Sequence, residues 1–508
     1  SVGGKGASLG EMYQKLSGIG VKVPNGFTLT TEAFRDFVNA DIPEATWDNV
    51  GNPEGIGNLR SEAIACKSLS SALEVCLRDA DASDHLGLNG RASLARSLVR
   101  ETPVPETVKR AIGSEYSKLC DMYYPGVDVA VRSSATTEDS AEASFAGQYE
   151  SYLNVSGESE IIEKWRRCVA SMFTERSVGY HLENGMHPLD SSIAVVVMKM
   201  ARSDKACSGV MFTIDPDSGH DGVIHIGSSY GLGELVVQGV VSPDTYTIWK
   251  KGLRMGKFPI VYRTLGGKEQ MMVYNEESTN EVHTIQVSLE ERKKWSLTKE
   301  ECVSLAEMGL KIEDFFGKPM DIEWAKDGIS NELFIVQARP ETIHSKSSKS
   351  KMMLYKIDEK LTSKLKKDGR VIAEGQAVGT RVGTGMVRLY RTYSEVVQGR
   401  RELQSLIDTG LAPEEISPEL SVFQNGDVLV TEMTTPDWEP LMKQASLIIT
   451  RKGGRTSHAA IIAREFGIPA IVGCSDALEI PNLSTVTGSC AEGDTAVSYT
   501  HLTLPTKA

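Results

Sequence analysis

The amino-acid sequence predicts an α/β protein of more than one domain, and two patterns carry this prediction. Apolar runs typical of buried strands alternate with segments of helical periodicity, which is the pattern of α/β domains. A polar, basic segment, residues 345–351 (SKSSKSK), then interrupts this pattern and has the composition of a linker. At 508 residues the chain is long enough to bury several separate cores, so we expect two to four domains.

The first part of the chain begins with a glycine turn and a helical pattern over residues 3–16. Thr30 or Thr31 is a candidate N-cap for a following helix over residues 32–38, because a threonine hydroxyl can accept a hydrogen bond from a free backbone N–H. Three later apolar runs have the composition of buried strands: residues 127–131, 194–200 and 223–226. Arg132 follows the first of these runs and precedes a loop rich in Ser and Thr.

Two short apolar runs on either side of a Lys-Asp-Gly turn predict a β-hairpin near residues 321–337. Asp321 and Glu323 are two positions apart on the first strand, so both carboxylates face one side, and Gln337 and Arg339 repeat this spacing on the second strand. Carboxylates are ligands for magnesium, and Arg binds phosphate. The alternative is the solvated face of an ordinary amphipathic hairpin.

The later part of the chain reads as a smaller, β-rich α/β unit with a strand over residues 427–433. Its strongest motif is GGRTSHAAIIAREFGIP, residues 453–469, which has the order of a glycine turn, a helix and a stop. Thr456 or Ser457 can cap the helix, and Gly467 can take the left-handed conformation at its end. His458 is therefore expected in the first helical turn.

A histidine in the first turn of a helix is well placed to carry a phosphoryl group. Free N–H groups and the positive end of the helix dipole favour an anion there, and paired glycines let it approach the backbone. The alternative for His458 is a histidine that only packs near a cap. The surrounding motif favours the phosphate-carrying role.

Composition and charge exclude several classes of function. The formal net charge of -13 argues against nucleic acid or an anionic membrane as the main partner. No run approaches the ~18 apolar residues of a membrane span, and no basic and apolar leader opens the chain, so we expect a cytosolic protein. The eight cysteines are scattered and predict reduced structural thiols, including Cys474 and Cys490.

These motifs together resemble the PEP-utilising enzyme family. The stretch GGRTSHAAIIAREFGIPAIVG is similar to the family's phosphohistidine motif, and most of residues 370–497 is similar to its swivelling domain. GGKGASLGEM, VAVRSSATTEDSAEASFAGQYESYLNV, GLGELVVQGVVSPD and MDIEWAKDG are similar to its nucleotide-binding domain. No G-x-x-x-x-G-K-[ST] motif occurs, so a P-loop is excluded.

The resemblance implies an α/β multidomain fold, in which an ATP-grasp nucleotide-binding domain over residues 1–343 precedes a swivelling β/β/α phosphohistidine domain over residues 370–497. Residues 344–369 would be the linker, and its basic stretch near residues 345–351 is the candidate hinge. The short interval before residue 375 leaves no room for the drug-binding domain of rifampin-type relatives. The polar, Pro-containing residues 498–508 break the preceding pattern, and we expect them to be a non-native extension.

The resemblance also implies roles for single residues. His458 would be the nucleophile, Asp321 and Glu323 would lie near Mg²⁺, and the residues in contact with ATP would be Lys5, Arg132, Gly147, Glu323, Gln337 and Arg339. Thr456 matches a threonine that a regulatory kinase and phosphorylase modify in some relatives, although it is also a candidate cap. Met198 stands where relatives often have a glutamine near adenine.

The activity implied by the resemblance has ATP as phosphate donor and pyruvate as final acceptor. ATP would transfer its β,γ portion to His458, the γ-phosphate would pass to water, and the remaining phosphoryl group would pass to pyruvate enolate. Family members that use inorganic phosphate in place of water are the closest alternative, and a non-catalytic nucleotide-binding module is a third. The pyruvate-binding domain is missing after residue 497, so we expect only the ATP half-reaction here. A homodimer is allowed for the full-length enzyme.

Overall fold

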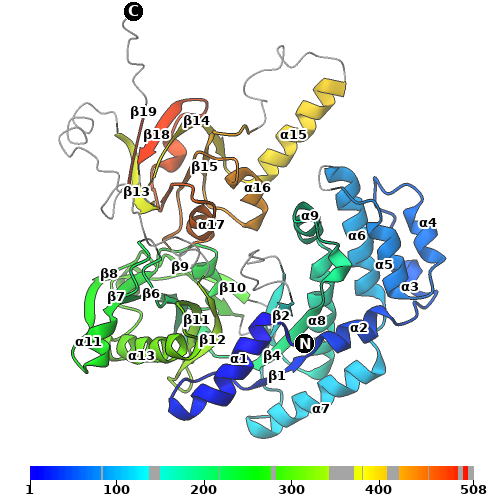
Figure 1. The fold of residues 1–508 in the computed structure, drawn as a ribbon, viewed down its shortest axis with the longest axis horizontal. Coiled ribbons are helices and arrows are strands. Elements are labelled where there is room, and N and C mark those ends of the chain that lie inside the picture. Colours follow the sequence, from blue (N-terminus) through cyan, green and yellow to red (C-terminus); the bar gives the residue numbers. More distant parts are fainter. Residues whose placement is uncertain are drawn as a thin grey trace, which may run out of the picture. The chain divides into compact units, whose positions relative to one another are not determined.

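Figure 1 shows the structure of the chain, a computed structural model. It describes residues 1–508 except residues 82–83, 137–148, 217, 276–281, 342–370, 380, 409–422, 456, 490–495 and 501–508. The chain divides into two units: the first comprises residues 1–202, 273–283 and 325–339, and the second comprises residues 203–272, 284–324 and 340–508. This division differs from the predicted domain boundaries, which stay predictions, and the predicted linker lies outside the described residues.

The first unit combines a four-stranded sheet with helices. The strands are neighbours in the order β1-β4-β2-β3 (Gly26–Leu29, Ile193–Lys199, Val129–Ala135 and Ser151–Val155), and all the pairs are antiparallel. The helices are α1 (Gly3–Leu16), α2 (Thr31–Val38), α3 (Thr46–Asn49), α4 (Leu59–Ile64), α5 (Leu69–Leu77), α6 (His85–Glu101), α7 (Glu106–Met122), α8 (Glu158–Ala170) and α9 (Glu175–Glu183). In Figure 1, α4, α5 and α6 lie together.

One hydrophobic core holds the first unit together. Alternate residues of the central strands, such as Val129 and Val131 on β2 and Val195 and Val197 on β4, are fully buried against helices. Phe37 of α2 packs edge to face on Trp165 of α8, with ring centroids 5.4 Å apart. Burial of large aromatic side chains from separate elements stabilises their packing, so this core fixes the sheet that carries Arg132.

The second unit contains a sheet whose strands are neighbours in the order β11-β5-β6-β7-β8. Their bounds are Met320–Lys326, Cys207–Phe212, Val223–Tyr230, Asp244–Trp249 and Ile260–Thr264. The nearby helices are α10 (Glu234–Val237), α11 (Lys250–Arg254), α12 (Leu289–Arg292) and α13 (Lys299–Phe316), of which α13 packs on β6 and β7. Strands β9 (Gln270–Tyr274) and β10 (Val282–Gln286) form a separate ladder. Strand β12 (Leu333–Pro340) follows β11 in sequence.

The second unit also contains a closed barrel with strands in the order β13-β17-β16-β15-β14-β18-β19. These strands are Val371–Val378, Ala470–Val472, Leu447–Thr450, Val428–Thr431, Val382–Tyr390, Thr485–Ser489 and Ala496–Thr500. Strands β14, β15, β16 and β17 run parallel to one another. Helices α15 (Tyr393–Asp408), α16 (Glu439–Met442) and α17 (His458–Phe466) accompany them (Figure 1).

Three of the parallel barrel strands, β15, β16 and β17, are buried on both faces, which explains their continuous apolar sequences. Val428 and Val430 point into one core inside the barrel, whereas Leu429 belongs to a second core shared with α16 and α17. On β16, Ile448 likewise belongs to the second core, where it packs with Leu429. Helix α17, which begins at His458, is held by this second core.

Most elements expected from the sequence are present, with three differences. Strand β2 continues through Arg132 to Ala135, because it pairs with β4 along its whole length. The turn of the hairpin spans residues 327–332, where the Asp327 carboxylate accepts hydrogen bonds from neighbouring N–H groups. Strand β19 extends to Thr500, three residues beyond the expected domain end, and pairs with β13 and β18.

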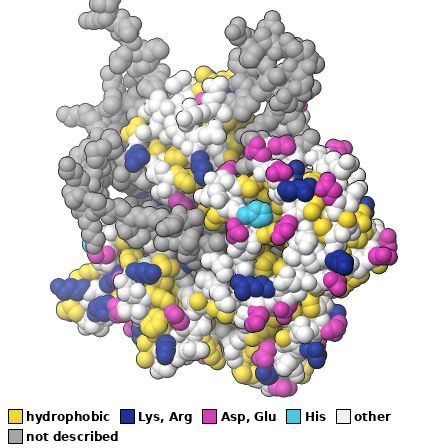
Figure 2. Space-filling model, turned by 45° about the vertical axis from the view of Figure 1, so that its right-hand side comes forward, with side chains coloured by type: hydrophobic (Ala, Val, Ile, Leu, Met, Phe, Trp, Pro, Cys, Tyr) yellow, Lys and Arg dark blue, Asp and Glu magenta, His cyan; other side chains and the backbone are white. Residues whose placement is uncertain are grey.

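The surface mixes charges of both signs. On the face shown in Figure 2, Lys and Arg side chains are interspersed with Asp and Glu. Within the described part of the chain, no helix combines the length and the apolar character needed to cross a membrane.

Candidate active site

The start of α1 lies directly against β2 in the first unit. The Gly6 N–H donates to Ser134 Oγ at 3.0 Å, and this hydroxyl donates to the Val2 carbonyl at 2.8 Å. Gly3 has φ +70°, and a Cβ there would lie 2.0 Å from the Ser134 carbonyl oxygen, so only glycine fits. This contact fixes the first turn of α1, which carries the half-buried Lys5, next to the strand that carries Arg132.

Arg132 connects β2 with β12. Its guanidinium donates from Nη1 to the Val336 carbonyl at 3.1 Å and from Nη2 to Gln337 Oε1 at 3.0 Å. Ser8 of α1 donates to the Ala338 carbonyl at 2.7 Å, between Gln337 and Arg339 in sequence. These hydrogen bonds hold α1, β2 and β12 side by side, and the three elements carry Lys5, Arg132, Gln337 and Arg339. Positive charges and an amide are side chains suited to a polyphosphate.

The turn before β12 is held by the buried Asp327. Its carboxylate accepts hydrogen bonds from the N–H groups of Ile329 and Ser330 at 2.8 and 3.0 Å, and it forms an ion pair with Lys199 at 3.4 Å. Burial alone would raise the pKa of the Asp327 carboxyl. These hydrogen bonds and the Lys199 charge outweigh burial and hold this pKa below its ordinary value. The turn is thereby tied to β4.

Asp321 and Glu323 lie on the part of β11 that belongs to the second unit. Both are half-buried and alternate with the buried Met320, Ile322 and Trp324, so the two carboxylates share one face, as the sequence predicts. Their convergence with Gln337 and Arg339 stays a prediction, because those residues belong to the first unit. No group of three or more His, Cys, Asp or Glu suited to a metal occurs among the described residues.

Two carboxylates on one strand face nevertheless fit Mg²⁺ in a nucleotide site. Magnesium is usually held by one or two carboxylates together with phosphate oxygens, and it keeps several waters. Asp321 and Glu323 have the hard oxygen donors and the partial exposure that this requires. They are the residues that would hold the ion.

His458 is the first residue of α17 in the second unit. Ser457 is the N-cap, and its Oγ accepts a hydrogen bond from the Ala460 N–H at 3.4 Å. Gly467 ends the helix with φ +67°, as expected. The preceding loop turns at Gly453, which has φ +101°. Of the two caps considered from the sequence, Ser457 is therefore the one that the structure uses.

Thr434 holds the ring of His458 and was not predicted. Its Oγ1 lies 3.0 Å from His458 Nδ1, and only 2% of the residue is exposed. Thr434 follows β15, and the histidine loop follows β16; these parallel neighbours end at the same edge of the barrel. In the tautomer in which Nδ1–H donates to Thr434, the lone pair lies on Nε2, so Nε2 is the nucleophilic atom.

Basic side chains flank the same loop. Glu432 forms ion pairs with Lys452 at 3.0 Å and Arg451 at 3.3 Å, immediately before Gly453. Burial alone would raise the pKa of the Glu432 carboxyl. The hydrogen bonds and charges of Lys452 and Arg451 outweigh burial and lower this pKa. This links the loop that follows β15 to the loop that follows β16.

The structure describes only some of the remaining candidate residues. Gly147 and Thr456 lie outside the described residues, as does Cys490. Met198 is buried on β4, opposite Gly26 and Ala130. Cys474 is a buried free thiol, and burial raises its pKa to about 11, which keeps it protonated near neutral pH.

Comparisons with known proteins place this geometry in a family. The profile of the "Pyruvate phosphate dikinase, AMP/ATP-binding domain" family matches residues 1–359, and that of the "PEP-utilising enzyme, mobile domain" family matches residues 423–493. The chain belongs to the pyruvate phosphate dikinase AMP/ATP-binding domain family. This confirms the predicted fold class, an ATP-binding α/β domain followed by a mobile domain of the PEP-utilising type.

Curated relatives in this family have the name phosphoenolpyruvate synthase. The protein from Synechocystis sp. is 42% identical over 98% of this chain and 55% of its own length, and that from Escherichia coli (strain K12) is 42% identical over 99% and 56%. A "Probable phosphoenolpyruvate synthase" from Pyrococcus abyssi is 36% identical over 94% and 54%. The chain thus spans about half the length of the curated relatives it matches.

Proposed function

We propose that this chain performs the ATP-dependent phosphorylation of His458 in a phosphoenolpyruvate synthase, with pyruvate as the final acceptor. The observation that carries the proposal is the position of His458, at the capped start of α17 with its Nδ1 held by Thr434. The names of the curated relatives support the same activity.

The first step is attack on ATP by His458. The lone pair on Nε2 forms a bond to the β-phosphorus, the bond from that phosphorus to the oxygen bridging it to the α-phosphate breaks, and AMP leaves with this oxygen. Thr434 accepts the Nδ1 proton in a hydrogen bond and keeps the imidazole in the required tautomer. The positive end of the α17 helix dipole stabilises the negative charge that arrives on His458.

Positive side chains of the first unit bind the triphosphate in this proposal. Arg132, which is oriented by Gln337 and the Val336 carbonyl, presents its positive guanidinium to phosphate oxygens, and Lys5 and Arg339 add charge. Asp321 and Glu323 would hold Mg²⁺, which would supply positive charge to the phosphates. Gly147 is included among the ATP contacts because of the family resemblance.

The later steps follow the same family pattern. Water attacks the γ-phosphorus, phosphate leaves, and the phosphoryl group on Nε2 then passes to the enolate oxygen of pyruvate. Transfer from ATP to pyruvate through His458 requires movement of the histidine domain, for which the basic stretch near residues 345–351 is the proposed hinge. The proposal also includes regulation through Thr456, a homodimer of the full-length enzyme and a cytosolic location.

The test uses ATP labelled separately at the β- and γ-phosphates. We expect the β label to appear on the wild-type chain in acid-labile, base-stable form, and to be absent from His458→Asn, which keeps a polar residue at the helix start. The γ label should appear in orthophosphate. Label in pyrophosphate that depends on added phosphate would assign a pyruvate phosphate dikinase activity, and an unlabelled wild-type chain would leave a nucleotide-binding module.

A further inference from the structure

The histidine loop lies against a short segment of the second unit, residues 239–243, which we call the seat. A Cβ on Gly239 would lie 2.1 Å from Ser457 Cβ, and a Cβ on Gly453 would lie 3.0 Å from the Gly239 carbonyl oxygen. A Cβ on Gly454 would lie 3.3 Å from Pro243 Cδ. Both segments belong to the second unit, and the contact is made one residue before His458.

Glycine is required at position 239 for two separate reasons. Its φ is +73°, a backbone conformation that side chains disfavour, and its missing Cβ leaves the space that Ser457 occupies. Gly256 separates these reasons, because it has a similar φ of +64° but no heavy atom within 4 Å of a Cβ placed there. The two glycines therefore share a backbone conformation, but only Gly239 has a neighbouring residue, Ser457, in the space that a side chain would fill.

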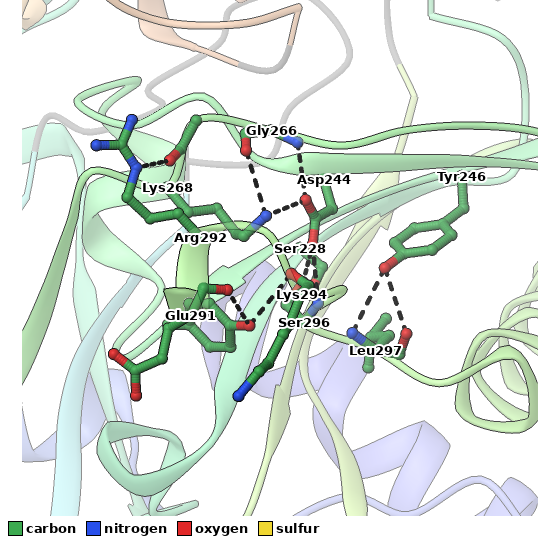
Figure 3. Close-up of polar contacts among 12 residues, drawn as sticks. Ser228, Asp244, Tyr246, Gly266, Lys268, Glu291, Arg292, Lys294, Ser296 and Leu297 are labelled. Atoms are coloured by element: carbon green, nitrogen blue, oxygen red, sulfur yellow. Dashed lines mark hydrogen bonds and ion pairs between the residues drawn. The ribbon is translucent and has the colours of Figure 1, made fainter. Parts of the chain in front are cut away.

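A buried ion pair fixes the end of the seat. Lys268 Nζ donates to Asp244 Oδ1, and both side chains are fully buried (Figure 3). The same oxygen accepts from the Gly266 N–H at 2.8 Å, while Oδ2 accepts from the N–H and hydroxyl of Ser296 at 2.8 and 2.7 Å. Buried charges persist when paired and fully hydrogen-bonded, so Asp244 is firmly held.

The loop that carries Lys268 also braces the seat directly. The Lys268 N–H donates to the Ser242 carbonyl at 3.1 Å. A Cβ on Gly266 would lie 2.3 Å from the carbonyl oxygens of Ser242 and Pro243, so the two backbones are in direct contact. Because the charged pair and the backbone contact act on the same short segment, the seat is a rigid surface.

We propose that the seat receives the histidine loop while His458 takes phosphate from ATP. Gly239 is a positioning residue in this proposal: the absence of a side chain lets Ser457 approach, which sets the distance of His458 from the nucleotide. Asp244 and Lys268 hold the seat ready for that contact. The inference rests on the proposed phosphorylation of His458, and it adds the surface on which that reaction takes place.

The test compares Gly239→Ala with Gly256→Ala in the full chain. Both variants place alanine at a left-handed position. The backbone strain should therefore lower the midpoint temperature of thermal unfolding by a similar amount in each. We expect Gly239→Ala alone to slow formation of labelled His458 about tenfold or more, since only there does the methyl group displace Ser457. Binding of a non-hydrolysable ATP analogue should be equal in both variants and the wild type.

The outcomes separate this proposal from the proposed function. A wild-type chain without label on His458 contradicts the function. A labelled wild type together with equal labelling rates for Gly239→Ala and Gly256→Ala overturns the seat and leaves the function standing. Weaker binding of the analogue in Gly239→Ala alone would also overturn the seat, because it would place Gly239 in the nucleotide site.

A disulfide test covers the case in which Gly239→Ala fails to fold. The pair Pro243→Cys and Gly454→Cys brings two thiols to positions in contact in the structure, and mild oxidation should link them in a bond that a reductant reverses. Gly256→Cys with Gly454→Cys is the control and should not be linked. Equal linkage in both pairs, or none in either, would contradict the seat.

Discussion

The two groups of candidate site residues differ in how far apart in sequence their hydrogen-bonded partners lie. In the first unit, Gly6 bonds to a residue 128 positions away, Arg132 to one 205 positions away, and Ser8 to one 330 positions away. In the second unit, Ser457 caps its own helix three positions on, and Thr434 reaches His458 across 24. The hydrogen bonds that hold His458 are thus short-range in sequence, whereas those of the nucleotide group join distant parts of the first unit.

The largest expected effect comes from breaking the long-range group. Arg132→Met removes a charge and two hydrogen bonds that join β2 to β12. We expect formation of labelled His458 to fall by about 100-fold or more, as for other charged groups that stabilise transferring phosphate. Rapid-quench labelling measures this rate, with Arg132→Lys recovering only part of it.

Arg96→Met is the matched control for that experiment. Arg96 lies in the same unit and pairs with Glu150 at 3.0 Å, but both side chains are more than a third exposed. Such surface pairs contribute little. Equal rates for the Arg132 and Arg96 variants would show that the group around β12 does not bind the triphosphate.

A smaller effect is expected from the local group. Thr434→Val keeps the shape of the side chain but removes the hydroxyl next to His458 Nδ1. Loss of one hydrogen bond worth about 1.4 kcal/mol would slow labelling about tenfold, with ATP affinity unchanged. Thr434→Ser should restore the rate. If valine and serine behave alike, the hydroxyl does not position the ring.

The same contrast explains what the sequence could predict. The Ser457 cap, the Gly467 stop and the place of His458 follow from residues close in sequence, and the structure agrees with them. Thr434 was missed because its contact depends on the parallel pairing of β15 and β16. A signal was available: both polar loops follow apolar runs that can be neighbouring parallel strands.

The resemblance to a known family predicted the nucleotide group, which comprises Lys5, Arg132, Gln337 and Arg339. The hydrogen bonds that support this group were not predicted. Ser134 and Ser8 give no local sign that they anchor α1 to strands far along the chain. The buried Asp327 looked like part of a short hairpin turn, yet it binds a longer turn to Lys199 of β4. Tertiary hydrogen bonds of this kind leave no periodic pattern in the sequence.

Asp327 offers a test through stability and pH. Asp327→Asn should lower the free energy of unfolding of the first unit by about 1–2 kcal/mol at pH 7 through weakened buried hydrogen bonds. Because the pKa of this carboxyl is lowered by folding, its contribution is present above about pH 4 and is lost as the pH falls through the folded-state pKa. Denaturant unfolding at several pH values measures both.

The control for this effect is Glu115→Gln, which removes an exposed ion pair with Lys118 on α7. It should change the free energy of unfolding little at any of these pH values. A difference between wild type and Asp327→Asn that grows as the pH falls below about 4 would contradict the assigned role.

The smallest expected effect concerns Cys474. Its thiol is buried next to the barrel strands and its pKa is raised to about 11, so little thiolate exists near pH 8. Iodoacetamide should therefore modify Cys474 only after unfolding, as peptide mass mapping can check. Rapid modification of the folded chain would show that the core inside the barrel is accessible to the reagent, which would contradict the burial of Cys474.

The most direct measurement of the central claim is the location of the phosphate after incubation with ATP and Mg²⁺. Electron-transfer fragmentation of peptides kept at neutral or basic pH should place one phosphoryl group on His458, and phosphorus NMR should assign it to Nε2. Phosphate on Nδ1, on another residue or on no residue of the folded chain would contradict the account.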